Sequence, residues 1–132
     1  MIRIVADTLS CIPPKEAESL GIALLPQIII FGEESFRDDT EITSEQFLER
    51  LTSSKVLPTT SAPSPELYHP IYQNALEQED ELIVILPSQK MSGTYRSATT
   101  AALEFPELKI HFFDTTILAP ALGSMVKVAH QW

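Results

Sequence analysis

The stretch that decides the fold is LIVILPSQKMSGT, residues 82–94. It begins with a short apolar run rich in branched side chains, which is typical of a buried parallel strand. A polar turn follows, and residues 95–104 then contain neither proline nor glycine, which favours a helix. Open α/β sheets bind anions at hydroxyl-bearing turns between the carboxyl end of a strand and the start of a helix. Ser92, Gly93 and Thr94 therefore mark a candidate binding turn.

A second group of hydroxyls stands earlier in the chain, at residues 59–64, which read TTSAPS. Another helical pattern follows it, in which apolar side chains recur between Leu67 and Leu76. Pro63 and Pro65 stiffen this turn, so its hydroxyls are held in place at low entropic cost. We therefore expect the two turns to converge on one small acidic group.

Length and charge limit the possible functions. The chain has 132 residues, which suits one domain with a real hydrophobic core. Its formal net charge of −9 disfavours nucleic acids and anionic membrane surfaces as partners, although a local group of N–H and hydroxyl donors can still hold one small anion. Cys11 is the only cysteine, and no apolar stretch is long enough to span a bilayer. Together with an amino-terminal region unlike a signal peptide, this favours a cytoplasmic protein.

The remaining patterns alternate between strands and helices. Apolar runs predict strands at residues 2–6, 22–31, 35–37, 82–86 and 109–113. Caps and helical spacing predict helices at residues 15–20, after Thr43, after Ser64, at 93–104 and from about 120 onward. Strands separated by helices predict an α/β fold, a three-layer domain with a mostly parallel sheet.

Prolines modify two of these elements. Pro26 interrupts the apolar run 22–31, so this run is expected to be an edge strand or two separate pieces. Pro70 should kink or delay the helix in which it falls. Residues 53–63 are expected to form a loop.

Several motifs together resemble those of a known family. They are Asp7-Thr8 with Pro13, Thr60-Ser61-Ala62-Pro63-Ser64, Met91-Ser92-Gly93-Thr94-Tyr95 with Ser97-Ala98, and Asp114-Thr115 ahead of Gly123. In this order they resemble the amino-terminal domain of the DegV family, the fatty-acid-binding proteins. The resemblance covers essentially the whole chain, and the pairing of the two hydroxyl turns is its specific part.

The resemblance implies a protein that holds one long-chain fatty acid. In some bacteria, proteins of this family present the acyl carboxylate to a separate kinase subunit, so the resemblance also implies a fatty-acid kinase subunit as a partner. The resemblance further implies that members of the family are two-domain proteins, longer than this chain. The chain is therefore expected to be a single amino-terminal domain over residues 1–132, with the second domain of the family absent.

The expected ligand contacts come from both turns. Thr60, Ser61 and Ser92 are expected to hydrogen-bond the carboxylate. The backbone amides near Gly93 and Thr94 are expected to add donors at the start of the helix. The alternative for Ser92 is a plain helix cap, a role that is compatible with ligand binding.

Acidic residues stand at the ends of two predicted strands. Asp7 and Thr8 follow the first strand, and Asp114 follows the strand at 109–113. A carboxylate next to the ligand's own carboxylate would repel it, so we expect these side chains to orient the hydroxyls from behind. The alternative is that they cap local turns.

Two other functions remain open from the sequence. One is a phosphate- or nucleotide-binding enzyme that uses the same turns, for which the chain offers only Asp7 and Asp114 as a base or metal ligand. The other is a half-protein with an assembly role that associates into a homo-oligomer. We favour a lipid-binding protein that is not an enzyme and needs no cofactor or metal, since the three histidines lack the spacing of metal ligands.

Overall fold

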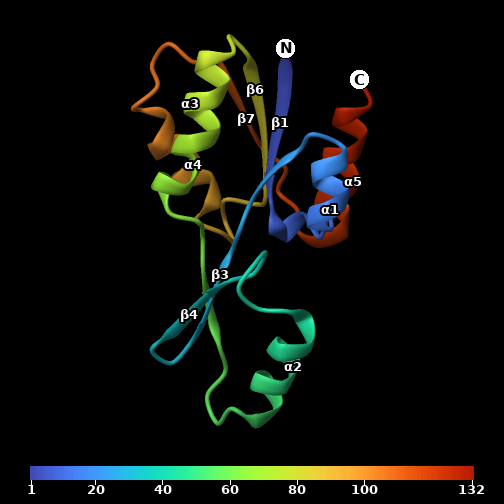
Figure 1. Ribbon diagram of the computed structural model, residues 1–132, viewed down its shortest axis with the longest axis vertical. Coiled ribbons are helices and arrows are strands. Elements are labelled where there is room, and N and C mark those ends of the chain that lie inside the picture. Colours follow the sequence, from blue (N-terminus) through green and yellow to red (C-terminus); the bar gives the residue numbers. More distant parts are fainter.

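A parallel sheet with helices on both faces forms the larger part of the molecule, in a computed structural model that describes residues 1–132 (Figure 1). The sheet has four strands in the order β2-β1-β6-β7. These strands are β1 Ile2–Asp7, β2 Ala23–Leu25, β6 Glu81–Leu86 and β7 Ile110–Asp114. The helices α1 Pro14–Ser19 and α5 Ala119–His130 cover one face, and α3 His69–Glu77 and α4 Thr94–Ala102 cover the other. The predicted three-layer α/β architecture is confirmed.

The central strands are apolar on both sides because each face of the sheet packs into its own core. Val5 of β1 belongs to the core beneath α3 and α4, whereas its neighbours Ile4 and Ala6 belong to the core beneath α1 and α5. In β6, Leu82, Val84 and Leu86 face the first core and Ile85 the second. A strand that is buried on both faces reads as a continuous apolar run, which explains the pattern at residues 82–86.

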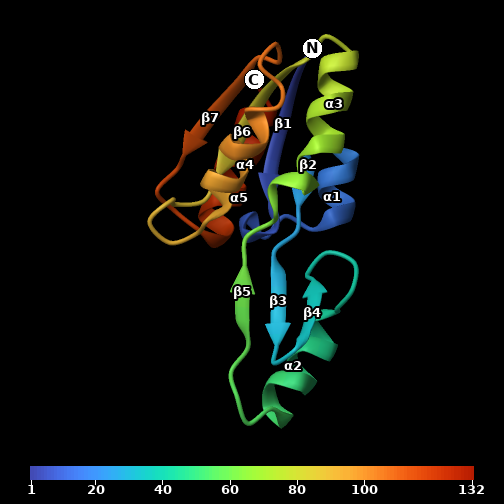
Figure 2. The ribbon, with the colours of Figure 1, turned by 90° about the vertical axis from the view of Figure 1, so that its left-hand side faces the viewer.

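A second, smaller sheet extends from the lower end of the parallel sheet (Figure 2). It is antiparallel and has three strands in the order β4-β3-β5. These strands are β3 Ile28–Phe31, β4 Glu34–Arg37 and β5 Thr59–Ser61, and the helix α2 Ser44–Ser53 packs against them. In this contact the rings of Phe31 and Phe47 lie 5.8 Å apart, and the Arg50 guanidinium lies 4.6 Å from the centre of the Phe36 ring.

The apolar run 22–31 is divided between the two sheets, which confirms the expectation of two pieces. Its first piece is β2 at the edge of the parallel sheet, and its second is β3 in the antiparallel sheet. Pro26 and Gln27 separate them, and both are buried. Because proline has no N–H to donate to a neighbouring strand, the pairing ends there and the chain changes sheet.

The prediction of a loop over residues 53–63 is wrong for β5. Thr59–Ser61 forms a strand that pairs with Ile28–Ile30 of β3. The polar sequence of β5 does not indicate a strand, because its pairing partner β3 lies far away along the chain. Threonine alone favours extended structure only weakly, since strand propensity depends on the surroundings.

The expectations for the capping box at Thr43 and for Pro70 agree with the structure, whereas the cap expected at Ser64 does not form. Thr43 and Gln46 form the reciprocal capping box that begins α2. Pro70 delays α3: a short 3-10 turn, η2 Pro65–Leu67, comes first, and α3 then begins with Pro70 in its first turn. Ser64 precedes η2 without making a side-chain cap bond.

The helix α5 lies unusually close to the turn that follows β1. This turn is η1 Thr8–Ser10. A methyl group on Gly123 of α5 would collide with the carbonyl oxygen of Ser10 and would also press on Ile12. The absence of a side chain at Gly123 therefore sets the distance between α5 and the end of β1.

Some large apolar side chains remain exposed between β7 and α5. Phe113, Met125 and Trp132 are the main ones. They border a shallow hollow over β6 whose floor includes Ile83 and Ile85. None of the helices has both the length and the apolar character needed to cross a bilayer.

Replacing Gly123 with alanine should destabilise the fold. The added methyl group meets backbone rather than a movable side chain, so we expect a loss of about 1–3 kcal/mol in the free energy of unfolding. Urea denaturation followed by circular dichroism measures this loss. Ser124→Ala, at the exposed neighbouring position in the same helix, is the control and should change stability by less than about 0.5 kcal/mol. Equal stability of the two variants would contradict the close approach.

Candidate functional site

A pocket of about 390 Å³ opens at the carboxyl ends of β1 and β6. The chain leaves β1 toward β2 on one side, while β6 and β7 lie on the other. Such a reversal of strand order leaves a crevice outside the carboxyl ends of the strands, which is the usual ligand position in open α/β sheets. The antiparallel sheet and α2 close the far side, so both sheets contribute to the walls. The polar lining residues are Gln27, Asp38, Thr60, Ser92 and Gly93.

The two hydroxyl turns meet at this pocket. Thr60, from β5, and Ser92, from the turn after β6, both line it. The turns also approach each other directly, since a methyl group on Gly93 would lie 3.5 Å from the Cβ of Ala62. A strand of the antiparallel sheet and a turn that follows a strand of the parallel sheet, distant in sequence, thus present hydroxyls to one space.

Ser61 and Thr94 lie differently from these two. In β5, Thr60 pairs with Ile29, which also lines the pocket, so the adjacent Ser61 is on the opposite side of the strand. The Ser61 hydroxyl donates to the Ala62 carbonyl, 3.2 Å away. Thr94 is fully buried behind Ser92. Its backbone N–H donates to Ser92 Oγ at 3.2 Å, so this amide is already used, and the residue at the N-cap of α4 is Gly93.

A chain of buried hydrogen bonds runs behind the pocket, and Gln27 is its centre. The Gln27 side-chain nitrogen donates to Asp7 Oδ2 at 2.9 Å and to Thr94 Oγ1 at 3.1 Å. Thr94 Oγ1 in turn lies 2.8 Å from Ser92 Oγ. Asp7, at the end of β1, is thereby connected to the hydroxyl that faces the pocket.

Asp38 and Thr8 hold the backbone of Gln27. Its N–H donates to Thr8 Oγ1 at 3.0 Å and to Asp38 Oδ1 at 2.9 Å. The Thr8 hydroxyl also donates to Asp38 Oδ2 at 2.6 Å. The sequence analysis missed Gln27 and Asp38. A polar residue inside the apolar run 22–31 was a signal for Gln27, but nothing in the sequence around Asp38 distinguishes it from other surface acids.

Burial makes Asp7 an unusual acid. It has no exposed surface, and one of its oxygens, Oδ1, has no hydrogen-bond partner. Burial of the carboxyl raises the pKa of Asp7 to about 7, and the nearby charge of Asp38 acts in the same direction. Burial also raises the pKa of Asp38 above its ordinary value. Asp38 lines the pocket and Asp7 lies behind it, and none of the lining residues is a cation.

Asp114 does not take part in this network. It ends β7, where its carboxylate accepts hydrogen bonds from the backbone N–H groups of Thr116 and Gln89. These bonds, that from Thr116 foremost, lower the pKa of Asp114. The structure therefore places Asp114 in a local turn rather than with Asp7 and Thr8.

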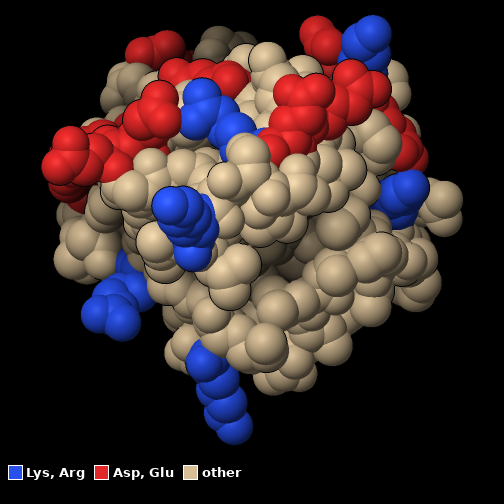
Figure 3. All heavy atoms as spheres, turned by 90° about the horizontal axis from the view of Figure 1, so that it is seen from below, with Lys and Arg blue, Asp and Glu red and all other residues tan.

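The other half of the pocket wall is apolar. It consists of Leu9, Ile29, Phe47, Ala62, Met91 and Leu118. A neighbouring groove of about 370 Å³ shares Ile29, Asp38 and Phe47 with the pocket and continues along α2. Seen from the α2 end, the molecule is hollowed, and uncharged residues surround the hollow (Figure 3). An elongated apolar ligand with a polar end suits such a wall.

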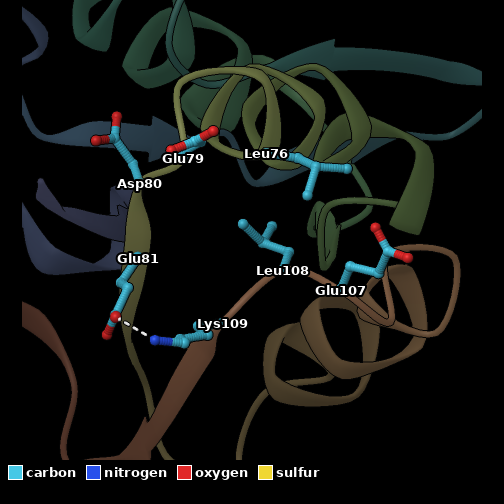
Figure 4. A pocket seen from close by; sticks show the side chains of 7 residues that line it. All are labelled: Leu76, Glu79, Asp80, Glu81, Glu107, Leu108 and Lys109. Carbon is cyan, nitrogen blue, oxygen red and sulfur yellow. Dashed lines mark hydrogen bonds and ion pairs between the residues drawn. The ribbon is translucent and has the colours of Figure 1, made fainter.

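A second pocket, of about 260 Å³, lies at the opposite end of the parallel sheet, where β6 and β7 begin (Figure 4). Its rim is acidic, with Glu79, Glu81 and Glu107 around the apolar side chains of Leu76 and Leu108. The one cation on this rim, Lys109, is already paired with Glu81 at 2.9 Å. Four acidic side chains thus line this pocket with one lysine, and the convergent donors of the first pocket have no counterpart here. No group of three or more His, Cys, Asp or Glu side chains is arranged to hold a metal ion.

Comparison with known proteins identifies similar chains. The family model described as "Uncharacterised protein, DegV family" matches residues 1–132. A DegV domain-containing protein from Halalkalibacterium halodurans is 33% identical over 97% of this chain and 46% of its own length. The chain spans about half the length of the curated relatives it matches.

Solved structures with the same fold are also similar. A DegV family protein from Thermus thermophilus, described by its fatty acid binding, has a TM-score of 0.88 and 34% identity, covering 98% of this chain and 46% of that one. DegV from Bacillus subtilis, described as a fatty acid binding protein, has a TM-score of 0.90 and 29% identity, again over 98% and 46%.

The raised pKa of Asp7 predicts that stability falls as the pH rises from about 4 to about 7. In this window the unfolded chain has released the Asp7 proton, whereas the folded protein still holds it. Each pH unit then costs up to about 1.4 kcal/mol of unfolding free energy. Asp7→Asn should remove this dependence and be more stable than the wild type at pH 8. Urea denaturation at several pH values measures both effects.

Asp114→Asn is the control with the opposite sign. Because the pKa of Asp114 is lowered in the folded protein, its carboxylate stabilises the fold once it is ionised. The Asp114→Asn variant should therefore lose stability relative to the wild type as the pH rises. Parallel pH profiles for the wild type and Asp7→Asn would contradict the burial argument.

Proposed function

The chain belongs to the DegV family, and from this premise we propose that it binds one long-chain fatty acid non-covalently in the pocket between its two sheets. Thr60 and Ser92 hold the carboxylate, with the backbone at Gly93 close by. Asp7, Thr8 and Thr94 support the Ser92 hydroxyl from behind, through the hydrogen bonds that meet at Gln27. The observation that carries the proposal is that a hydroxyl from β5 and a hydroxyl from the turn after β6 line one pocket whose opposite wall is apolar.

The polar end orients the ligand. A hydrogen bond from a hydroxyl to a charged carboxylate contributes about 1.5–3 kcal/mol. Two such bonds fix the position of a head group, but the repulsion from Asp38 on the same wall offsets part of this gain. Most of the affinity must therefore come from elsewhere in the ligand.

The apolar end supplies that affinity. Each buried methylene group contributes about 0.8 kcal/mol, so a tail of many carbons outweighs the head group. The tail lies against Ile29 and Phe47 and continues into the groove along α2, which shares both residues with the pocket. The descriptions of the Thermus and Bacillus proteins as fatty acid binders support the same choice of ligand.

The proposal extends to what happens to the bound acid. Thr60 is exposed and Ser92 half-buried, so the carboxylate lies near the surface, where a separate fatty-acid kinase subunit can reach it. The lining residues include no histidine, lysine or cysteine to serve as a base. We therefore assign presentation of the acid, rather than its chemical conversion, to this chain, which spans about half the length of its relatives.

The pocket disfavours the alternative of a phosphate or nucleotide ligand. A phosphate group carries up to two negative charges and is usually bound by Arg or Lys. The lining has no cation, and Asp38 adds a negative charge. A singly charged carboxylate with a long apolar tail fits this balance better.

Removing both hydroxyls should weaken binding without unfolding the protein. Thr60→Ala combined with Ser92→Ala should reduce fatty-acid affinity at least tenfold, since two charge-assisted bonds of about 1.5 kcal/mol or more are lost. Mass spectrometry of the denatured wild type should release about one equivalent of fatty acid, and displacement of a fluorescent fatty acid gives the affinities.

Thr59→Ala is the matched control, because Thr59 is the same residue type in the same strand but pairs with Ile30, on the other side from Thr60. It should bind as the wild type does. Absence of any fatty acid in the purified and in the loaded wild type, or unchanged affinity of the double variant, would contradict the proposal.

Affinity should also rise with the length of the tail. We expect about 0.8 kcal/mol, or about fourfold, for each added methylene group until the apolar wall is covered, followed by a plateau. Competition binding with saturated acids of increasing length measures this slope. An affinity that does not depend on length would show that the tail lies in solvent.

A further inference from the structure

We propose that the pocket takes up a proton together with its fatty acid, and that Asp7 holds this proton while the ligand stays a carboxylate. This inference rests on the proposed function and concerns the regulation of the same site. The proton comes from the solvent and binds to the Asp7 carboxyl, so no covalent bond to the ligand forms or breaks. Fatty-acid binding therefore weakens as the pH rises.

Acidic groups gather at the pocket before any ligand binds. Asp38 lines it directly. Asp7 lies one side chain further in, because Gln27 both lines the pocket and donates to Asp7 Oδ2 at 2.9 Å. No lysine, arginine or histidine lines the pocket to balance these acids. A bound carboxylate is a third acid in this group, and like charges that share one site favour the protonation of one of them.

Hydrogen bonding distinguishes the two acids of the protein. Both oxygens of Asp38 accept: Oδ1 from the Gln27 backbone N–H at 2.9 Å, and Oδ2 from the Thr8 hydroxyl at 2.6 Å. Such bonds stabilise the charged form of a carboxyl group. Asp7 Oδ1, by contrast, has no hydrogen-bond partner, although the residue has no exposed surface. A proton on Asp7 removes the cost of an incompletely bonded buried charge, so Asp7 is the acid that takes it.

The surroundings of Asp7 contain no group that could replace this proton. Burial raises the pKa of Asp7 to about 7, the Thr94 side chain lowers it by less, and the charge of Asp38 raises it. Burial also raises the pKa of Tyr68, to which the charge of Asp7 contributes, so Tyr68 stays neutral. The remaining neighbours of Asp7 are uncharged: Gln27, Leu25 on β2, the backbone of Leu9 and Ser10 in η1, and Leu86 at the end of β6.

The size of the effect follows from linkage. At pH 7.5 the empty protein holds the Asp7 proton in about a quarter of its molecules. If the charge of the ligand makes this proton bind about tenfold more tightly, the fraction rises to about three quarters. The coupling is reciprocal, so the protonated protein also binds the ligand about tenfold more tightly than the deprotonated one. The affinity should then fall about eightfold between pH 6 and pH 9.

Isothermal titration calorimetry of the full 132-residue chain measures the uptake. Decanoate, which is ionised throughout this pH range, is titrated at pH 7.5 in two buffers that differ in their enthalpy of ionisation. The difference between the two observed heats gives the number of protons, and we expect about half a proton per decanoate. Decanol has the same length but no charge, so its binding should take up no proton and should not change between pH 6 and pH 9.

Three asparagine variants assign the proton to one residue. Asp7→Asn should abolish the uptake and bind decanoate equally well at pH 6 and pH 9. Asp38→Asn removes a charge that raises the pKa of Asp7, so the uptake should persist but move to lower pH. Asp39→Asn is the matched control, because Asp39 is adjacent in sequence but pairs with Arg37 at 2.8 Å, and it should behave as the wild type does.

Infrared difference spectra show where the proton is bound. The C=O band of a protonated carboxyl group should grow when decanoate binds to the wild type, and this growth should be missing in Asp7→Asn. Decanoate with an isotopically labelled carboxyl carbon separates the band of the ligand from that of the protein. A band at the position of the labelled ligand would place the proton on the fatty acid and refute the assignment to Asp7.

The outcomes separate this inference from the proposed function. Decanoate binding without proton uptake, or uptake that survives Asp7→Asn and is lost in Asp38→Asn, refutes the inference and leaves fatty-acid binding intact. If the wild type binds decanoate at no pH, the proposed function fails and this inference fails with it. Circular dichroism shows whether each variant folds. If Asp7→Asn does not fold, the heats and the infrared band of the wild type decide.

Discussion

The buried carboxyl group of Asp7 is the constraint on which the rest of the structure depends. A buried acid must receive hydrogen bonds or keep its proton, because an isolated charge in the interior is too costly. Here the acid ends β1 and receives a bond from Gln27, the residue directly after Pro26, at the interruption between β2 and β3. The same interruption ends β2 and sends β3 out of the parallel sheet. The contact of Asp7 with Gln27 thus lies where the chain passes from the parallel sheet to the antiparallel sheet, beside the pocket between these two sheets.

The position of the pocket follows from the order of the strands. β1 lies between β2 and β6. The chain continues from β1 to β2 on one side of it, whereas β6 and β7 lie on the other side. The turns after β1 and β6 therefore open side by side, and the antiparallel sheet brings Thr60 to the same place from a distant part of the chain. The resulting pocket wall is polar where the turns meet and apolar where α2 packs. It therefore matches a ligand that has one polar and one apolar end.

The sequence predicts the parallel sheet well because its signals are local. The apolar run 82–86 and the capping box at Thr43 depend on neighbouring residues, and each appears in the structure as expected. β5 was missed because its pairing with β3 is visible only after folding. For the candidate site, hydroxyl turns could be recognised from composition, but Asp38 could not. Ser61 shows a further limit, since whether a strand residue faces the pocket depends on a register that the residues 59–64 do not reveal.

One hydroxyl of the pocket lies on β5 of the antiparallel sheet and the other in the turn that follows β6 of the parallel sheet. The chain crosses between these sheets only at Pro26–Gln27 and again after β5. A molecule that contacts both hydroxyls therefore connects the two sheets at a third point. This connection is reversible, and its contribution to rigidity depends on the fraction of protein molecules that hold a ligand. If the proposed fatty acid occupies the pocket, its binding therefore stiffens the connection between the two sheets.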